Sequence, residues 1–198
     1  MEIARLIALL ENHGIEWRQP TRVVSTVRGP ESSRLSAEEK VHLFRRLFRG
    51  RTDVYPVRWE SKASGKSGYI PACANEWRPG VCERPRIKCA GCPNRSLIPL
   101  SDSVIYDHLA GLHTVGVYPL LEDDTCYFLA VDFDEAEWRA DVQAFKRACD
   151  ELGVPVAIEI SRSGRGAHAW IFFASRVQAR DARRLGTALI SHTCASTR

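Results

Sequence analysis

The chain has 198 residues, a length typical of one domain or of one domain with a small insertion. With 44% hydrophobic and 26% charged residues, it has the composition of a soluble globular protein that can build a core. The formal net charge of +4 is mild, and no apolar run approaches the length that spans a bilayer, which excludes a membrane-spanning protein.

The charges are distributed unevenly along the chain. Basic residues cluster at 44–51, 84–88 and 176–184, while acidic residues gather at 121–125 and 132–137. Basic patches beside a localised acidic site indicate a polyanionic partner whose phosphates are handled near a metal ion. Each cluster taken alone fits a solvated helix face equally well.

The amino-terminal residues 1–17 lack the long apolar segment of a signal peptide. The chain nevertheless contains seven cysteines. Cysteines in a protein without an export signal are typical of a reducing cytosol, where they bind metal more often than they form disulfides. We therefore expect a cytoplasmic protein.

The first half of the chain predicts helices and short strands. Residues 1–35 are expected to form a short amphipathic helix, at 3–13, and a linker rich in Pro, Gly and Ser. Ser36 and Glu39 form a capping box that begins a second helix, which should end at Gly50. Its predicted buried stripe is Leu43, Phe44, Leu47 and Phe48. Short strands are expected at 54–60 and 68–76.

The segment 73–99 has little periodicity and is expected to be irregular. The elements predicted after it are a helix at 101–111, strands at 113–121 and 125–134, a helix at 135–153, a strand at 154–161, a tight loop at 162–166, a strand at 167–173 and a last helix at 177–195. This order favours an α+β fold, a sheet of antiparallel hairpins covered by helices.

The irregular segment holds four cysteines spaced C-x8-C-x6-C-x2-C, namely Cys73, Cys82, Cys89 and Cys92. A CxxC pair can present two thiolates to one metal, and two further thiolates complete a tetrahedral Zn²⁺ shell. The pattern favours structural zinc, with an iron–sulfur cluster or unrelated buried thiols as alternatives because the first spacing is not that of a standard finger. The remaining cysteines, Cys126, Cys149 and Cys194, are predicted to lie in the core.

Two aspartates, Asp132 and Asp134, follow the apolar run 127–131 with only Phe133 between them. Side chains alternate along a strand, so both carboxylates are expected on one face at the strand's end. Their repulsion is resolved if they share divalent cations, which can also bind a nucleoside triphosphate and activate a hydroxyl. Alternatively, residues 134–137 form a capping box for the next helix, with Asp134 as the cap and Asp132 merely exposed.

A Ser/Gly/Arg turn precedes a strand that carries His168, Trp170 and Phe172 on one face. Backbone N–H groups of a Gly-rich turn can hold a phosphate, and arginines add positive charge. The predicted nucleotide-binding residues are Ser161, Arg162, Ser163, Gly164, Arg165 and His168. Alone, the histidine would be read as a structural residue, but here it follows both the turn and the paired aspartates.

These motifs resemble the archaeo-eukaryotic primase superfamily, whose signature is a DxD strand followed by a strand-borne histidine after a small polar turn. The sequence is most similar to the primase–polymerase domain of TOTE conflict systems. The resemblance covers nearly everything from Ser36 onward and rests on the segments LFRGRTDVYPVRWE, GKSGYIPACANEWRPGVC, CAGCPNR, VIYDHLAGLHTVGVYPLL and FLAVDFD.

The resemblance implies an RRM-like catalytic core over 36–198 with a zinc-binding insertion at 73–99. Asp132 and Asp134 would hold catalytic Mg²⁺ or Mn²⁺, and His168 would contact the nucleotide's phosphates together with Ser163 and Arg165. The activity would be metal-dependent transfer of nucleotides from nucleoside triphosphates to a 3′-hydroxyl on a DNA or RNA template, as part of a defence system.

The superfamily pattern includes a third acidic residue on a later strand, and this sequence has no clear counterpart of it. Asp181 lies in the predicted last helix and is a poor substitute, while Glu159 could face either side of its strand. Relatives are usually large proteins with a downstream helicase, so we expect this chain to be an amino-terminal fragment. The alternatives are a zinc-stabilised nucleic-acid-binding module without catalysis and a metal-dependent nuclease or phosphotransferase.

Overall fold

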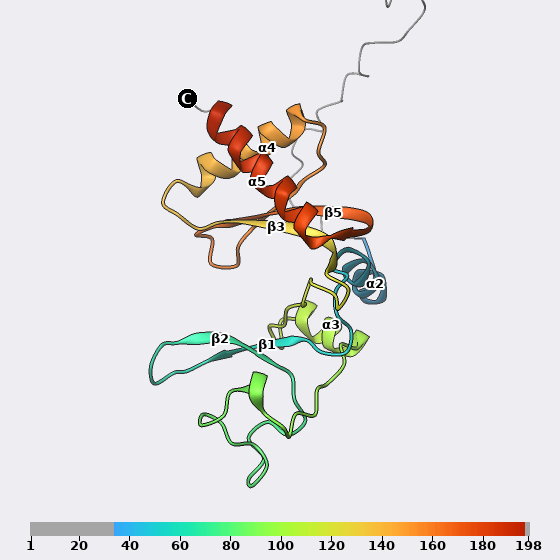
Figure 1. Cartoon of the computed structure of the whole chain (residues 1–198), viewed down its shortest axis with the longest axis vertical. Helices are drawn as coiled ribbons and strands as arrows, with labels where there is room; N and C mark the ends of the chain where they lie inside the picture. Colours follow the sequence, from blue (N-terminus) through green and yellow to red (C-terminus); the bar gives the residue numbers. More distant parts are fainter. Residues whose placement is uncertain (1–33, 197–198) are drawn as a thin grey trace, which may run out of the picture. The chain divides into compact units, whose positions relative to one another are not determined.

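The computed structural model describes residues 34–196, which form two antiparallel sheets and their helices (Figure 1). The predicted helix at 3–13 and nearly all of the predicted linker lie outside the described residues. The mixture of helices and antiparallel strands confirms the α+β expectation. No helix within 34–196 is both long enough and apolar enough to cross a membrane.

Helix α2, Ala37–Leu47, begins as predicted. The Ser36 hydroxyl accepts a hydrogen bond from the Glu39 N–H, and the Glu39 carboxylate accepts one from the Ser36 N–H. The hydrogen bond from the Ser36 N–H to the carboxylate, and in second place the nearby Ser36 hydroxyl, lower the pKa of Glu39. The helix ends at Leu47 rather than at Gly50. A Cβ at Gly50 would lie 2.4 Å from the Tyr118 carbonyl oxygen, so close approach of two backbones, rather than helix termination, requires the glycine.

The smaller sheet is a hairpin of β1, Pro56–Glu60, and β2, Ser67–Pro71. The strand predicted at 113–121 is wrong, because that segment forms only one isolated bridge, between Val115 and Val57. Its residue 119 is a proline, which has no N–H to donate to a ladder. As predicted, 73–99 is largely irregular, apart from the single turn η1, Cys89–Gly91. Helix α3, Asp102–Leu109, follows.

The larger sheet has the order β3–β5–β4, with every neighbouring pair antiparallel. Strand β3 spans Thr125–Phe133, β4 spans Ala157–Ile160, and β5 spans Ala167–Gln178. Strand β5 therefore continues well past the predicted end at residue 173. Because β5 is the central strand, its side chains lie between those of β3 and β4 on each face of the sheet.

Helices α4, Trp138–Glu151, and α5, Ala179–Ser196, lie on the same side of this sheet (Figure 1). The core between them consists of Phe145, Cys149, Ala169, Ile171 and Leu189. Burial raises the pKa of the thiols of Cys126 and Cys149, as expected for core cysteines. The expectation for the third cysteine, Cys194, is wrong, because its position on α5 is exposed.

The opposite face of the sheet is aromatic. Phe48, which follows α2, packs edge-on against Phe128, Trp170 and Phe172, with ring centroids 5.0–5.8 Å apart. The neighbouring Arg49 donates a hydrogen bond of 3.1 Å to the Phe173 carbonyl. The carboxyl end of α2 is thereby fixed to the larger sheet.

Candidate functional site

Three polar side chains lie side by side across the larger sheet. The register pairs His168 of β5 with Asp132 of β3 on one side and with Glu159 of β4 on the other. Directly opposed residues of neighbouring strands share a face, so all three side chains project from the same face. The His168 Nε2 lies 3.5 Å from Asp132 Oδ1, and its Nδ1 lies 3.5 Å from Glu159 Oε2.

The two carboxylates of this row are accessible to ligands. The side chains of Asp132 and Glu159 are 65% and 55% exposed, whereas that of His168 is only 33% exposed. The His168 Nδ1 atom is buried and makes no hydrogen bond, since 3.5 Å is too long for one of normal strength. The imidazole is therefore partly enclosed between two accessible carboxylates.

Trp170 fixes the position of Glu159. Its indole Nε1 donates a hydrogen bond of 2.9 Å to Glu159 Oε2. The same indole packs against Phe48 and Phe128 in the aromatic cluster. Sequence reasoning placed Trp170 on the histidine's face but did not find this bond, because the partner comes from the neighbouring strand.

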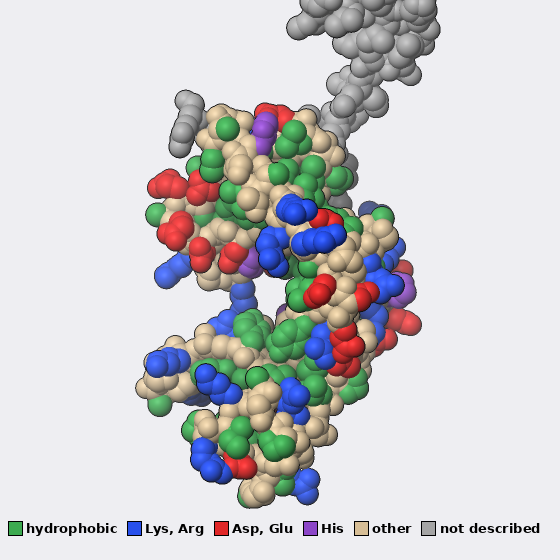
Figure 2. Space-filling view, viewed as in Figure 1, with side chains coloured by type: hydrophobic (Ala, Val, Ile, Leu, Met, Phe, Trp, Pro, Cys, Tyr) green, Lys and Arg blue, Asp and Glu red, His purple; other side chains and the backbone are tan. Residues whose placement is uncertain are grey.

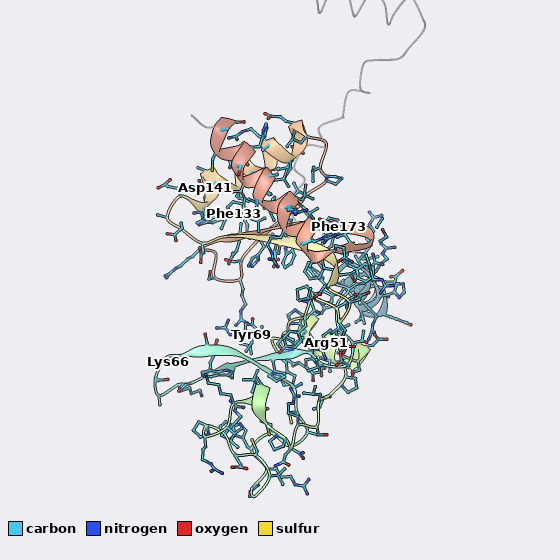
Figure 3. All side chains as sticks on the ribbon, in the orientation of Figure 1. Arg51, Lys66, Tyr69, Phe133, Asp141 and Phe173 are labelled. Atoms are coloured by element: carbon cyan, nitrogen blue, oxygen red, sulfur yellow. The ribbon has the colours of Figure 1, made fainter. Side chains whose placement is uncertain are left out.

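Asp134 is the first residue after β3. The capping alternative is wrong, because α4 begins at Trp138 with Glu137 as its N-cap and without any side-chain cap bond. Asp132 and Asp134 instead line one groove of about 500 Å³, which is also lined by residues of α4 and α5 such as Asp141. Figure 3 labels Phe133 and Asp141 in this region, and Figure 2 shows acidic side chains gathered there.

The turn between β4 and β5 is tight. The Gly164 N–H donates to the Ser161 carbonyl at 2.8 Å, and the Arg165 N–H donates to the Ser163 hydroxyl at 3.2 Å. Gly164 has a φ of +69°, a left-handed conformation that glycine adopts without strain. Two of the N–H groups predicted to hold phosphate are thus engaged within the turn itself.

The arginines of the turn are both exposed. Arg162 does not point at the carboxylates but donates a hydrogen bond of 3.2 Å to the Thr114 hydroxyl, in the segment that follows α3. Gly166, at the end of the turn, lies against the end of β3, where an added Cβ would be 2.6 Å from the Phe133 carbonyl oxygen. The turn and the aspartates therefore adjoin.

The four cysteines of the irregular segment come together. All of them are free thiols and line one cavity of about 20 Å³, room for about one water-sized body. The Ser96 N–H donates to the Cys73 sulfur at 3.4 Å. Four thiols around such a space are a suitable donor set for zinc. Within residues 34–196, however, no group of three or more His, Cys, Asp or Glu side chains is arranged to hold a metal ion, so zinc binding stays a prediction.

The cysteine segment also presents an aromatic side chain to solvent. Trp77 is 62% exposed and has a φ of +57°, a strained conformation for a bulky residue. The guanidinium of Arg84 lies 4.6 Å from the centre of its ring and also pairs with Glu76. Figure 2 shows further basic side chains over this segment and the β1–β2 hairpin.

Comparison with known proteins identifies a family. The family model described as "TOTE conflict system, Archaeo-Eukaryotic Primase domain" matches residues 39–198, more than half of the chain. The matched range begins within α2 and includes both sheets, the cysteine segment and the row of polar side chains. No curated protein matches the chain.

Proposed function

The chain belongs to the family of archaeo-eukaryotic primase domains of TOTE conflict systems, and from this premise we propose that it is a primase–polymerase-type nucleotidyltransferase domain. It would transfer nucleotides from nucleoside triphosphates to a 3′-hydroxyl on a DNA or RNA template, within a defence system. A helicase module would be its functional partner.

The observation that carries this proposal is the pairing of Asp132 with His168 on an accessible face beside the 161–166 turn. Asp132 and Asp134 would hold Mg²⁺ or Mn²⁺, because they lie two residues apart at the end of β3, the Asp132 side chain is 65% exposed, and carboxylate oxygens are the ligands that these hard cations prefer. When bound, the cations supply charge neutralisation of the triphosphate and activation of the attacking hydroxyl.

The other residues would bind and orient the triphosphate. The His168 Nε2, on the side of Asp132, would contact a phosphate oxygen. Arg165 is exposed on the adjoining turn and would add positive charge, while the serine hydroxyls of that turn would donate hydrogen bonds. Glu159 is unsuited to be a third metal ligand beside Asp132, since His168 lies between them and Trp170 occupies one of its oxygens.

Zinc would organise the segment 73–99. All four cysteines line one cavity of about 20 Å³ in a segment that has almost no regular structure, where a metal can supply the folding energy that a core would otherwise provide. The exposed Trp77 and the basic residues around it would then hold a template strand through base stacking and phosphate contacts.

A second candidate function is nucleic-acid binding without catalysis. It is favoured by the position of Glu159, which leaves the two aspartates without that residue as a third ligand. Template binding without any metal-dependent handling of nucleoside triphosphates would support this candidate over the first.

The test is calorimetric titration of a nucleoside triphosphate with Mn²⁺ into the wild type, Asp132→Ala and Asp181→Ala. The control residue Asp181 is exposed on α5 and pairs with the neighbouring Arg184. We expect Asp132→Ala to lose Mn²⁺-dependent binding and Asp181→Ala to retain it. Wild-type affinity in Asp132→Ala would contradict the assigned role of the aspartates.

A further inference from the structure

The smaller sheet carries a row of three side chains on one face. Arg58 of β1 is paired with Tyr69 of β2. On the other edge of β1, the antiparallel bridge between Val57 and Val115 puts Thr114 opposite Arg58, whose N–H donates to the Thr114 carbonyl at 2.9 Å. Because opposed residues share a face, Tyr69, Arg58 and Thr114 project from the same side of the hairpin.

This face presents an uncovered aromatic ring. Tyr69 is 55% exposed. On the reverse face, Trp59 lies over its own cross-strand neighbour, since a Cβ at Gly68 would be 3.2 Å from three atoms of the indole. The backbone of the hairpin thus covers part of Trp59, whereas the ring of Tyr69 is available to a ligand.

The row faces the turn that adjoins His168. Arg162 of that turn donates a hydrogen bond of 3.2 Å to the hydroxyl of Thr114, which is the end member of the row. Figure 3 shows Tyr69 on the side of the hairpin that is turned toward the larger sheet. The hydrogen bond between Arg162 and Thr114 thus links the Tyr69 face to the turn that adjoins the end of β3.

We propose that the Tyr69 face is a nucleobase-binding surface next to the 161–166 turn and that the Tyr69 ring stacks on a base there. This inference rests on the proposed function. A phenol ring offers a flat surface that stacks on any base, and the cross-strand Arg58 adds positive charge and a planar group next to it. Arg58 is held in place by bonds of 2.6 and 3.0 Å to Glu60.

The same stacking chemistry serves a base of an incoming nucleotide or a base of a template strand. Two binding assays distinguish them. The first titrates ATP or dATP with Mn²⁺, and the second measures anisotropy of a fluorescein-labelled single-stranded oligothymidylate of about 16 nucleotides. Both are made on the wild type and on variants of Tyr69, and melting temperatures check that each variant is folded.

We expect Tyr69→Ala to weaken at least one of the two affinities by about tenfold, as found for loss of one stacked base. Tyr69→Phe should bind like the wild type, whereas Tyr69→Leu, which keeps apolar bulk but has no aromatic ring, should bind like the alanine variant. Tyr106→Ala is the matched control, because Tyr106 is exposed to a similar extent, 49%, but lies on α3 and not on the Tyr69 face.

A loss confined to the nucleotide titration assigns the base to the incoming nucleotide, and a loss confined to the oligonucleotide assigns it to the strand. Wild-type affinities of Tyr69→Ala in both assays, with Asp132→Ala still defective, would overturn the inference and leave the proposed function intact. If the wild type bound neither probe, the proposed function and the inference would both be wrong.

Discussion

Gly166 joins the turn to β5 at the point where the turn meets the end of β3, and Gly166→Ala tests this contact. The added methyl would lie 2.6 Å from the Phe133 carbonyl oxygen and 3.4 Å from the Asp134 Cα. The first distance is about 0.8 Å short of the 3.4 Å at which ordinary contact begins, and the opposing atom belongs to the backbone, so the strand end must move.

Overpacking of this kind costs about 1–3 kcal/mol of unfolding free energy. For a domain of about 150–250 residues, each kcal/mol lowers Tm by about 2–4 °C, so we expect Tm to fall by about 2–12 °C. Because the displaced strand end carries the aspartates, Mn²⁺-dependent nucleotide binding should weaken as well. The assays are calorimetric melting and nucleotide titration.

The control is Gly91→Ala, because a methyl at Gly91 meets nothing within 4 Å and its φ is not in the left-handed range. We expect the control to melt like the wild type. If Gly166→Ala melted within about 1 °C of the wild type, far less than one kcal/mol of overpacking implies, the close approach of the turn to β3 would be refuted.

Three further predictions concern other parts of the chain. Purified protein should contain one zinc per chain, and Cys89→Ser should lose it while Cys194→Ser keeps it; elemental analysis that finds no zinc in the wild type would remove the zinc proposal. Iodoacetamide at about pH 8 should modify Cys194 in the native protein but not Cys126 or Cys149, because burial raises the pKa of both thiols and leaves little thiolate; mass spectrometry that finds equal modification would contradict this. Glu159→Ala should shift the indole N–H resonance of its tryptophan partner and cost about 1 kcal/mol of unfolding free energy, whereas Glu159→Gln retains an acceptor; an unshifted resonance in the alanine variant would disprove the hydrogen bond.

Features set by neighbours in sequence were predictable. The capping box of Ser36 and Glu39 depends on residues three apart, and the structure contains both of its hydrogen bonds. Strand β3 was predictable from its continuous apolar run, and the placement of Trp170 and Phe172 on the histidine's face follows from strand alternation. The family resemblance rested on such local motifs, and the family match confirms it.

Features set by pairing between distant segments were not predictable. The apolar pattern of 113–121 is that of a strand, but the neighbouring segments give it only one bridge. The orientation of Glu159 depends on its register with β5, which one sequence does not reveal. The hydrogen bond between Arg162 and Thr114 joins residues far apart in the chain, so it could not be predicted, while the assignment of Arg162 to phosphate stays a prediction. Cys194 was predicted to lie in the core, because the sequence alone does not show which face of α5 is exposed.

The most direct test of the account is incorporation of labelled nucleotides on a single-stranded template with Mn²⁺. It is made with the full gene product that contains residues 1–198, with its Asp132→Ala variant and with the Asp181→Ala control. The account predicts synthesis by the wild type and the control that is lost in Asp132→Ala. Template binding by the wild type without any synthesis would contradict it and would make the domain a nucleic-acid-binding module.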